Sequence, residues 1–247
     1  MIFFLLILPV KRPPELDEVP DFTTFSSLLR ITTKYEMPAV RSHLLKAVRD
    51  AYPENFEGVN PRKPLGETVF SGPTPHPNEV LNLFVQQKLT SALPMAYYMA
   101  AQRGLNSLMD RSLPQSATLS LEVLQSAIGG LMAIREVELN GTHRLVFCPK
   151  GSHPCSESKC LLNTLTGPAV LEAYQSVFDH IVGSSQRGTK ALQVPKFYVP
   201  VNAGGGHQDG MRMFPGICDS CTGRWESGHA DLRAKVWAML PGAFGLL

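Results

Sequence analysis

The stretch Val19–Pro53 decides the fold, and it reads VPDFTTFSSLLRITTKYEMPAVRSHLLKAVRDAYP. Asp21 can cap a helix, and apolar residues recur at helical spacing from there to Tyr35, which predicts an amphipathic helix. Pro38 suits the first position of a second helix, which Pro53 ends. Because only a short break separates the two patterns, the stretch predicts a hairpin of two amphipathic helices.

The same helical spacing recurs along the rest of the chain, in segments separated by proline and glycine. We therefore expect a mostly α-helical fold, with strands favoured only at Arg144–Cys148 and Gln193–Val201. The adjacent pair Tyr97-Tyr98 is expected to be buried on one side only. The further helices are expected to start at Pro77, Pro94, Ser120, Pro168 and about Thr222.

The overall charge gives no electrostatic reason to expect nucleic acid or an anionic membrane as a partner. The formal net charge is +2 over 247 residues, and proteins that bind phosphate backbones usually carry a clustered basic face. The apolar run Met1–Val10 is too short to span a bilayer, and no basic residue precedes it as in a secretory signal. We therefore expect a cytoplasmic or nuclear protein that is not bound to a membrane.

The quoted hairpin resembles the last helical pair of a BTB/POZ domain, especially in the large set of BTB-domain proteins of mushroom-forming fungi. The matching phrase is SLLRITTKYEMPAVRSHLLKAV, and the likeness continues through Leu83–Met109 and Leu121–Leu131. It ends in a paired-cysteine region and a closing phrase at Trp237–Leu246. The resemblance implies a protein–protein interaction module with another protein as its partner, either an adaptor for ubiquitin ligases or a transcription-related factor.

One departure from the family pattern is large. Strands and early helices precede the hairpin in a complete BTB domain, whereas the segment 1–18 does not resemble them. The chain therefore looks like a truncated member or a gene model with a wrong start, and homodimerisation is in doubt because the family's dimer interface lies in that part. The expected divisions are an atypical segment (1–18), a BTB-like helical hairpin (19–53), a connector (54–76) and a helical region with paired cysteines (77–247).

Two pairs of cysteines form the best candidate metal site. Cys155 and Cys160 are separated by four residues, and Cys218 and Cys221 form a CxxC motif just before the last expected helix. Four thiolates brought together by the fold would make the tetrahedral set that Zn²⁺ prefers. Cys148 lies outside this spacing and would be the spare thiol. The alternatives are unrelated thiols, some of them buried as small apolar residues, and disulfide or redox chemistry.

No catalytic or phosphate-binding motif of the common kinds is found, so we expect a non-enzymatic protein with no small-molecule substrate. His229 follows the CxxC motif, but it lies on an apolar stripe with Leu232, which favours a core histidine over a metal ligand. Two other functions stay open. One is a zinc-dependent nucleic-acid-binding protein that uses the CxxC helix as its reader, which the near-neutral charge argues against; the other is a nonfunctional truncated fragment.

Overall fold

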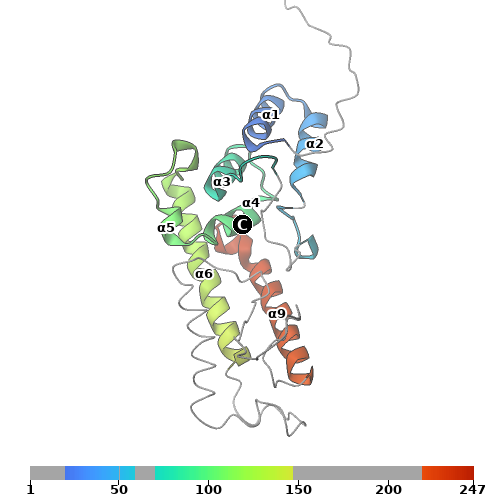
Figure 1. The fold of residues 1–247 in the computed structure, drawn as a ribbon, viewed down its shortest axis with the longest axis vertical. Coiled ribbons are helices and arrows are strands. Elements are labelled where there is room, and N and C mark those ends of the chain that lie inside the picture. Colours follow the sequence, from blue (N-terminus) through green and yellow to red (C-terminus); the bar gives the residue numbers. More distant parts are fainter. Residues whose placement is uncertain (1–19, 50, 59–69, 147–218) are drawn as a thin grey trace, which may run out of the picture.

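The computed structural model describes residues 20–49, 51–58, 70–146 and 219–247. Seven α-helices, two short 3-10 helices and no strand occupy these residues, so the predicted mostly helical fold is confirmed (Figure 1). The α-helices are α1 (Phe22–Lys34), α2 (Pro38–Val48), α3 (Pro77–Gln86), α4 (Leu93–Ala101), α5 (Leu105–Leu108), α6 (Leu121–Val146) and α9 (Asp219–Ala243); the 3-10 helices are η1 (Phe56–Gly58) and η2 (Gln115–Ala117).

The first two helices form the hairpin that the sequence predicts. Asp21 caps α1, because its Oδ1 accepts a hydrogen bond from the backbone N–H of Thr24 at 3.0 Å. Pro38 occupies the first position of α2, where a helix does not need the backbone donor that proline lacks. Between them Glu36 adopts a left-handed backbone with φ of 51°, which reverses the chain within a few residues.

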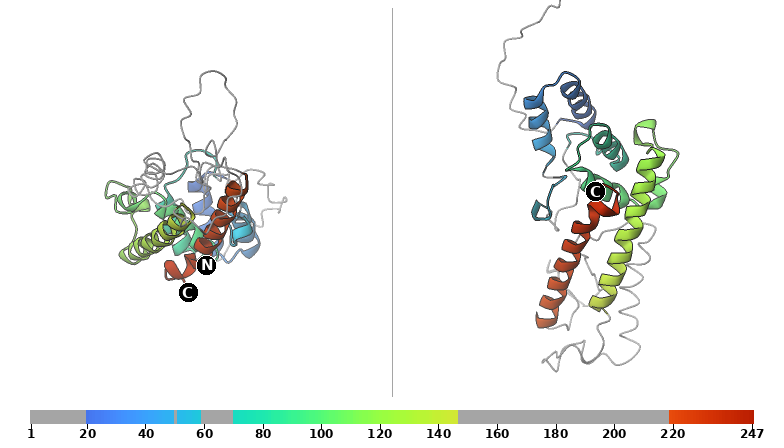
Figure 2. Two further views of the ribbon diagram at one scale, coloured as in Figure 1. Left: turned by 90° about the horizontal axis from the view of Figure 1, so that it is seen from below. Right: turned by 180° about the vertical axis from the view of Figure 1, so that it is seen from behind.

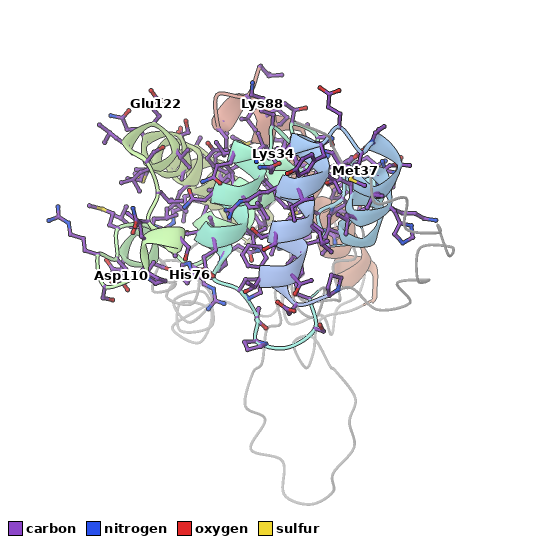
Figure 3. The ribbon with its side chains drawn as sticks, turned by 90° about the horizontal axis from the view of Figure 1, so that it is seen from above. Lys34, Met37, His76, Lys88, Asp110 and Glu122 are labelled. Atoms are coloured by element: carbon purple, nitrogen blue, oxygen red, sulfur yellow. The ribbon has the colours of Figure 1, made fainter. Side chains whose placement is uncertain are left out.

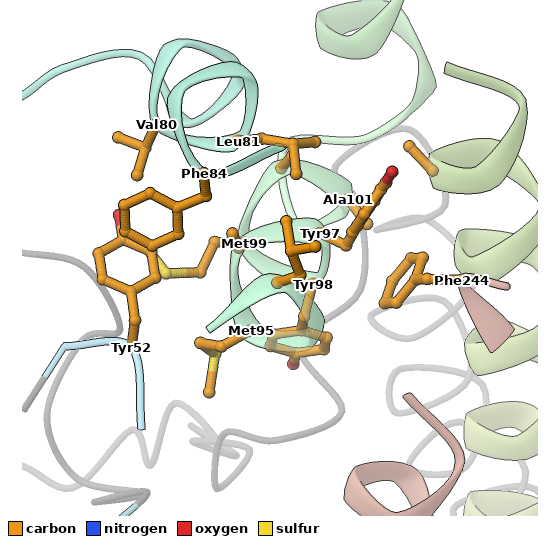
Figure 4. Close-up of a cluster of buried hydrophobic side chains, with 14 of the residues drawn as sticks. Tyr52, Val80, Leu81, Phe84, Met95, Tyr97, Tyr98, Met99, Ala101 and Phe244 are labelled. Carbon is orange, nitrogen blue, oxygen red and sulfur yellow. The ribbon is translucent and has the colours of Figure 1, made fainter. Parts of the chain in front are cut away.

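The core is built around α4, which is buried on every side. Its residues from Met95 to Ala101 are all buried, as expected for a helix with no polar face. Tyr97 and Tyr98 are both buried, so the prediction that this pair is buried on one side only is wrong. The reason is that α3, α6 and α9 all pack on α4 and enclose it (Figure 4).

The two longest helices, α6 and α9, run antiparallel and in contact (Figures 1 and 2). Gly130 of α6 lies against the ring of Phe244, and Gly141 lies against Leu232. A Cβ atom at either glycine would overlap the facing side chain, so both glycines let the helices approach closely. The pair extends away from α4, and α6 ends where α9 begins, at the end farther from the hairpin (Figure 1).

One of the two predicted strands falls partly within a helix. The prediction of a strand at Arg144–Cys148 is wrong for Arg144–Val146, which form the last turn of α6. Helix α6 packs against α9 and continues without a break over 26 residues, and strand preference is weak and depends on context. Residues 147 and 148, and the other predicted strand at Gln193–Val201, lie outside the described residues, as does the helix expected to start at Pro168.

Candidate functional site

The hairpin has a buried face that fixes it to the rest of the molecule. Phe25 and Leu29 of α1 and Leu44 of α2 are buried in the core. At the far end of α1, the Thr33 hydroxyl donates a hydrogen bond to the side-chain oxygen of Gln87 at 2.8 Å, which ties α1 to the end of α3. The hairpin is therefore held to the rest of the fold by apolar packing together with polar contacts.

The end of the hairpin where α1 and α2 meet exposes four large apolar side chains. Ile31, Tyr35, Met37 and Val40 are 46%, 64%, 44% and 37% exposed, and we call these four residues the hairpin patch. They come from the last turns of α1, the break and the first turn of α2, so they belong to the end of the hairpin where the two helices meet, and Figure 3 labels Met37 there. Clustered exposed apolar residues mark interaction surfaces, whereas isolated ones are ordinary.

The clustering distinguishes the hairpin patch from the other exposed apolar residues. Within the described ranges ten large apolar side chains are exposed, and four of them fall inside ten consecutive residues. The remaining six are spread over the first residue of α5 and the residue after its end, the length of α6, and the residues after α9. They are Leu105, Met109, Leu121, Met132, Leu139 and Leu247.

A second cluster, around His76, has the composition of a catalytic site but the geometry of a helix cap. His76 Nδ1 accepts from the backbone N–H of Asn78, and Nε2 lies 3.2 Å from the Ser107 hydroxyl. The ring must then carry its proton on Nε2 and donate it, whereas a base that activates serine needs a free nitrogen facing the hydroxyl. Glu79 completes a capping box by accepting from the His76 backbone N–H at 3.2 Å.

The environment of His76 agrees with this structural role. Burial, assisted by the positive charge of Arg103, holds the pKa of His76 below its usual value, so the ring is neutral at pH 7. A neutral ring keeps the acceptor that caps α3 and the donor that reaches Ser107 in α5. The cluster therefore joins α3 to α5, and sequence patterns gave no indication of it because no common motif spans residues 76–107.

His229 is buried on the face of α9 that packs in the core, beside Leu232 and Val236, as the sequence predicted. Burial, followed by the charge of Arg233, lowers its pKa to about 4. The side chain is thus neutral at physiological pH. Its place among core residues makes it part of the packing of α9 rather than a member of an exposed site.

The cysteine prediction lies almost entirely outside the described residues. Cys155, Cys160 and Cys218, like the spare Cys148, fall within 147–218, and only the backbone of Cys221, in the first turn of α9, is described. Among the residues whose positions are given, no three His, Cys, Asp or Glu side chains gather as metal ligands would. The structure therefore leaves the proposed zinc site as a prediction.

Comparison with known proteins adds no identification: no family model, curated protein or solved structure matches the chain. None of the described helices is long and apolar enough to cross a bilayer. The functional argument therefore depends on the residues themselves, and the hairpin patch is the strongest feature that they present.

Proposed function

We propose that the chain is a non-enzymatic protein–protein interaction module whose binding face is the hairpin patch. The observation that carries the proposal is the exposure of four large apolar side chains within ten residues, on a hairpin whose other face is firmly packed. Covering such side chains contributes roughly 25 cal/mol per Å² of apolar surface removed from water. A rigid support also limits the entropy lost when a partner binds.

The resemblance to BTB/POZ domains supports the same face. In a complete domain of that kind, strands and early helices pack against the hairpin that SLLRITTKYEMPAVRSHLLKAV resembles. Tyr35, Met37 and Val40 lie within this phrase, so the hairpin patch belongs to an element that, in the family it resembles, packs against other protein elements. A role in the cytoplasm or nucleus, as a ubiquitin-ligase adaptor or a transcription-related factor, is the biological setting that this resemblance suggests.

We also propose that Cys155, Cys160, Cys218 and Cys221 bind zinc and hold the chain together at the open end of the α6–α9 pair. The support is topological, because α6 ends and α9 begins at the same end of that pair (Figure 2). The segment that carries three of the four cysteines therefore leaves and re-enters the described fold at the same end of the pair. A tetrahedral thiolate site there would join the two ends.

Site-specific photo-cross-linking tests the proposed binding face. A benzophenone amino acid placed at Tyr35 should form discrete protein adducts in extracts of the source cells, and Ile31→Glu should abolish them. The matched control places the same group at Leu121, which is exposed on α6 far along the chain from the patch. Identical adduct patterns at the two positions would show that the patch has no special role in binding.

A further inference from the structure

The charges around the hairpin patch are strongly biased. Between Arg30 and Lys46 the chain carries four basic side chains and one acidic side chain, Glu36. The whole chain, by contrast, has 23 basic and 21 acidic residues. The four basic residues are Arg30, Lys34, Arg41 and Lys46.

Two of these basic residues, Arg30 and Lys34, form an i, i+4 row on α1 next to Ile31 and Tyr35, whereas Arg41 is partly buried and donates to the Gln87 carbonyl and Lys46 lies at the other end of α2. Lys34 Nζ lies over the Tyr35 ring, 5.5 Å from its centre, so one positive charge is next to the exposed aromatic surface. Lys88 adds another, because Gln87 is hydrogen-bonded to Thr33 near the end of α1 and Lys88, which follows it, is exposed (Figure 3). The patch is therefore an apolar centre with a mainly positive border.

We propose that the hairpin patch binds an amphipathic helix of another protein, one whose apolar stripe is bordered by aspartate and glutamate. This inference rests on the proposed function and specifies the chemistry of the partner. A helix presents apolar residues at i, i+3, i+4 and i+7, which suits a compact patch made from the ends of two helices. Acidic residues beside that stripe would face the basic border and favour this partner over neutral or basic ones.

The same charge distribution argues against a second copy of the chain as the occupant. A two-fold symmetric contact would place the patch against itself, so that Lys34 and Arg30 of one copy face the same residues of the other. Like charges across an interface disfavour association. An anionic membrane is also a poorer fit, because a helix that lies in a membrane surface exposes apolar residues along its length, whereas α1 exposes Ile31 in its last turns and Tyr35 just beyond its end.

The test uses the full chain and two fluorescein-labelled helical peptides of identical leucine spacing, one with glutamate and one with lysine beside the leucines. Fluorescence anisotropy should show at least about tenfold tighter binding of the glutamate peptide at low salt, and the difference should shrink as salt screens the charges. The charge-reversing variant Arg30→Glu/Lys34→Glu should reverse the preference. Met132→Glu, at an exposed apolar site on α6, is the matched control and should bind as the unchanged chain does.

Each other result overturns the inference in a distinguishable way. Equal binding of both peptides, lost in Tyr35→Ser, would refute the acidic partner but leave the patch as a protein-binding face. Binding of neither peptide would refute the inference, while the cross-linking at Tyr35 still decides the proposed function. Tighter binding to vesicles of phosphatidylserine and phosphatidylcholine than to the glutamate peptide, or self-association in sedimentation that Tyr35→Ser removes, would replace the helical partner by a membrane or a second copy.

Discussion

Gly129 and Gly130 are neighbours in α6, yet they differ in whether a side chain would fit at their position. A Cβ atom on Gly130 would overlap the ring of Phe244, whereas a Cβ atom on Gly129 would meet nothing. Gly130→Ala should therefore lower the free energy of unfolding by about 1–2 kcal/mol, the cost of overpacking less the gain in helix propensity. Gly129→Ala should raise it by up to about 1 kcal/mol. Urea denaturation of the two variants checks this, and changes of the same sign and size would contradict the close contact between α6 and α9.

His229 makes the stability of the fold depend on pH. In the folded chain its pKa is about 4, whereas in the unfolded chain a histidine has a pKa near 6.5. The unfolded state therefore binds a proton first as the pH falls. Stability should be complete above about pH 6.5 and decline toward pH 4, by up to about 3 kcal/mol from this group.

Urea denaturation at a series of pH values measures that decline. His229→Gln should flatten the dependence over this range, whatever its effect on stability at pH 7. His76→Asn is the comparison, because the lowered pKa of the partly exposed His76 acts in the same direction. If the unchanged chain and His229→Gln lose stability in parallel, His229 is not the group responsible.

At the scale of single elements, the hairpin needs the rest of the fold. Helices α1 and α2 have 13 and 11 residues, and isolated helices shorter than about 12–15 residues are marginal in water. The rings of Phe22 and Phe25 both lie 5.2 Å from that of Phe70, outside the hairpin. A peptide of residues 19–53 should therefore be largely unfolded by circular dichroism. A sharp, cooperative thermal transition of this peptide would contradict that dependence.

The cysteine proposal makes a second prediction at this scale. Cys218→Ser should release bound zinc, measured by elemental analysis of the purified chain, whereas Cys148→Ser should retain it. Because metal binding is coupled to local folding, zinc removal should increase amide exchange in the first turns of α9 and leave the hairpin unchanged. The hairpin lies at the opposite end of the molecule from those turns (Figure 1). A chain that holds no zinc, or that holds equal amounts in both variants, would refute the site.

Sequence patterns predicted elements best where the local and tertiary preferences agree. Asp21 and Pro38 marked the starts of α1 and α2 because caps and prolines act through the chain immediately around them. Arg144–Val146 were mispredicted because they continue the long helix α6. The burial of Tyr98 was mispredicted because α3, α6 and α9, which are distant in sequence, pack on α4. The sequence pattern around Tyr35 predicted the hairpin. It could not predict which apolar side chains of the hairpin are exposed, because that depends on which of them pack against the rest of the fold.

At the scale of the whole molecule, the fold separates a packed body from one distinctive exposed face. Helix α4 and the helices around it form the core, and the hairpin projects beside α3 with its patch uncovered (Figures 1 and 3). Arg30 and Lys34 were present in the sequence, but only the structure shows that Lys34 lies beside the exposed ring of Tyr35. The proposed function rests on this juxtaposition and not on any motif.

Hydrogen–deuterium exchange of the full chain, with and without the protein trapped by the cross-linker at Tyr35, tests the central claim most directly. Binding at the hairpin patch should slow exchange of backbone amides from Ile31 to Val40, because a covering partner excludes water and suppresses local opening. Exchange along the exposed face of α6, around Met132, should not change. Protection confined to α6 or α9, with Ile31–Val40 unaltered, would contradict the assignment of the hairpin patch as the binding face.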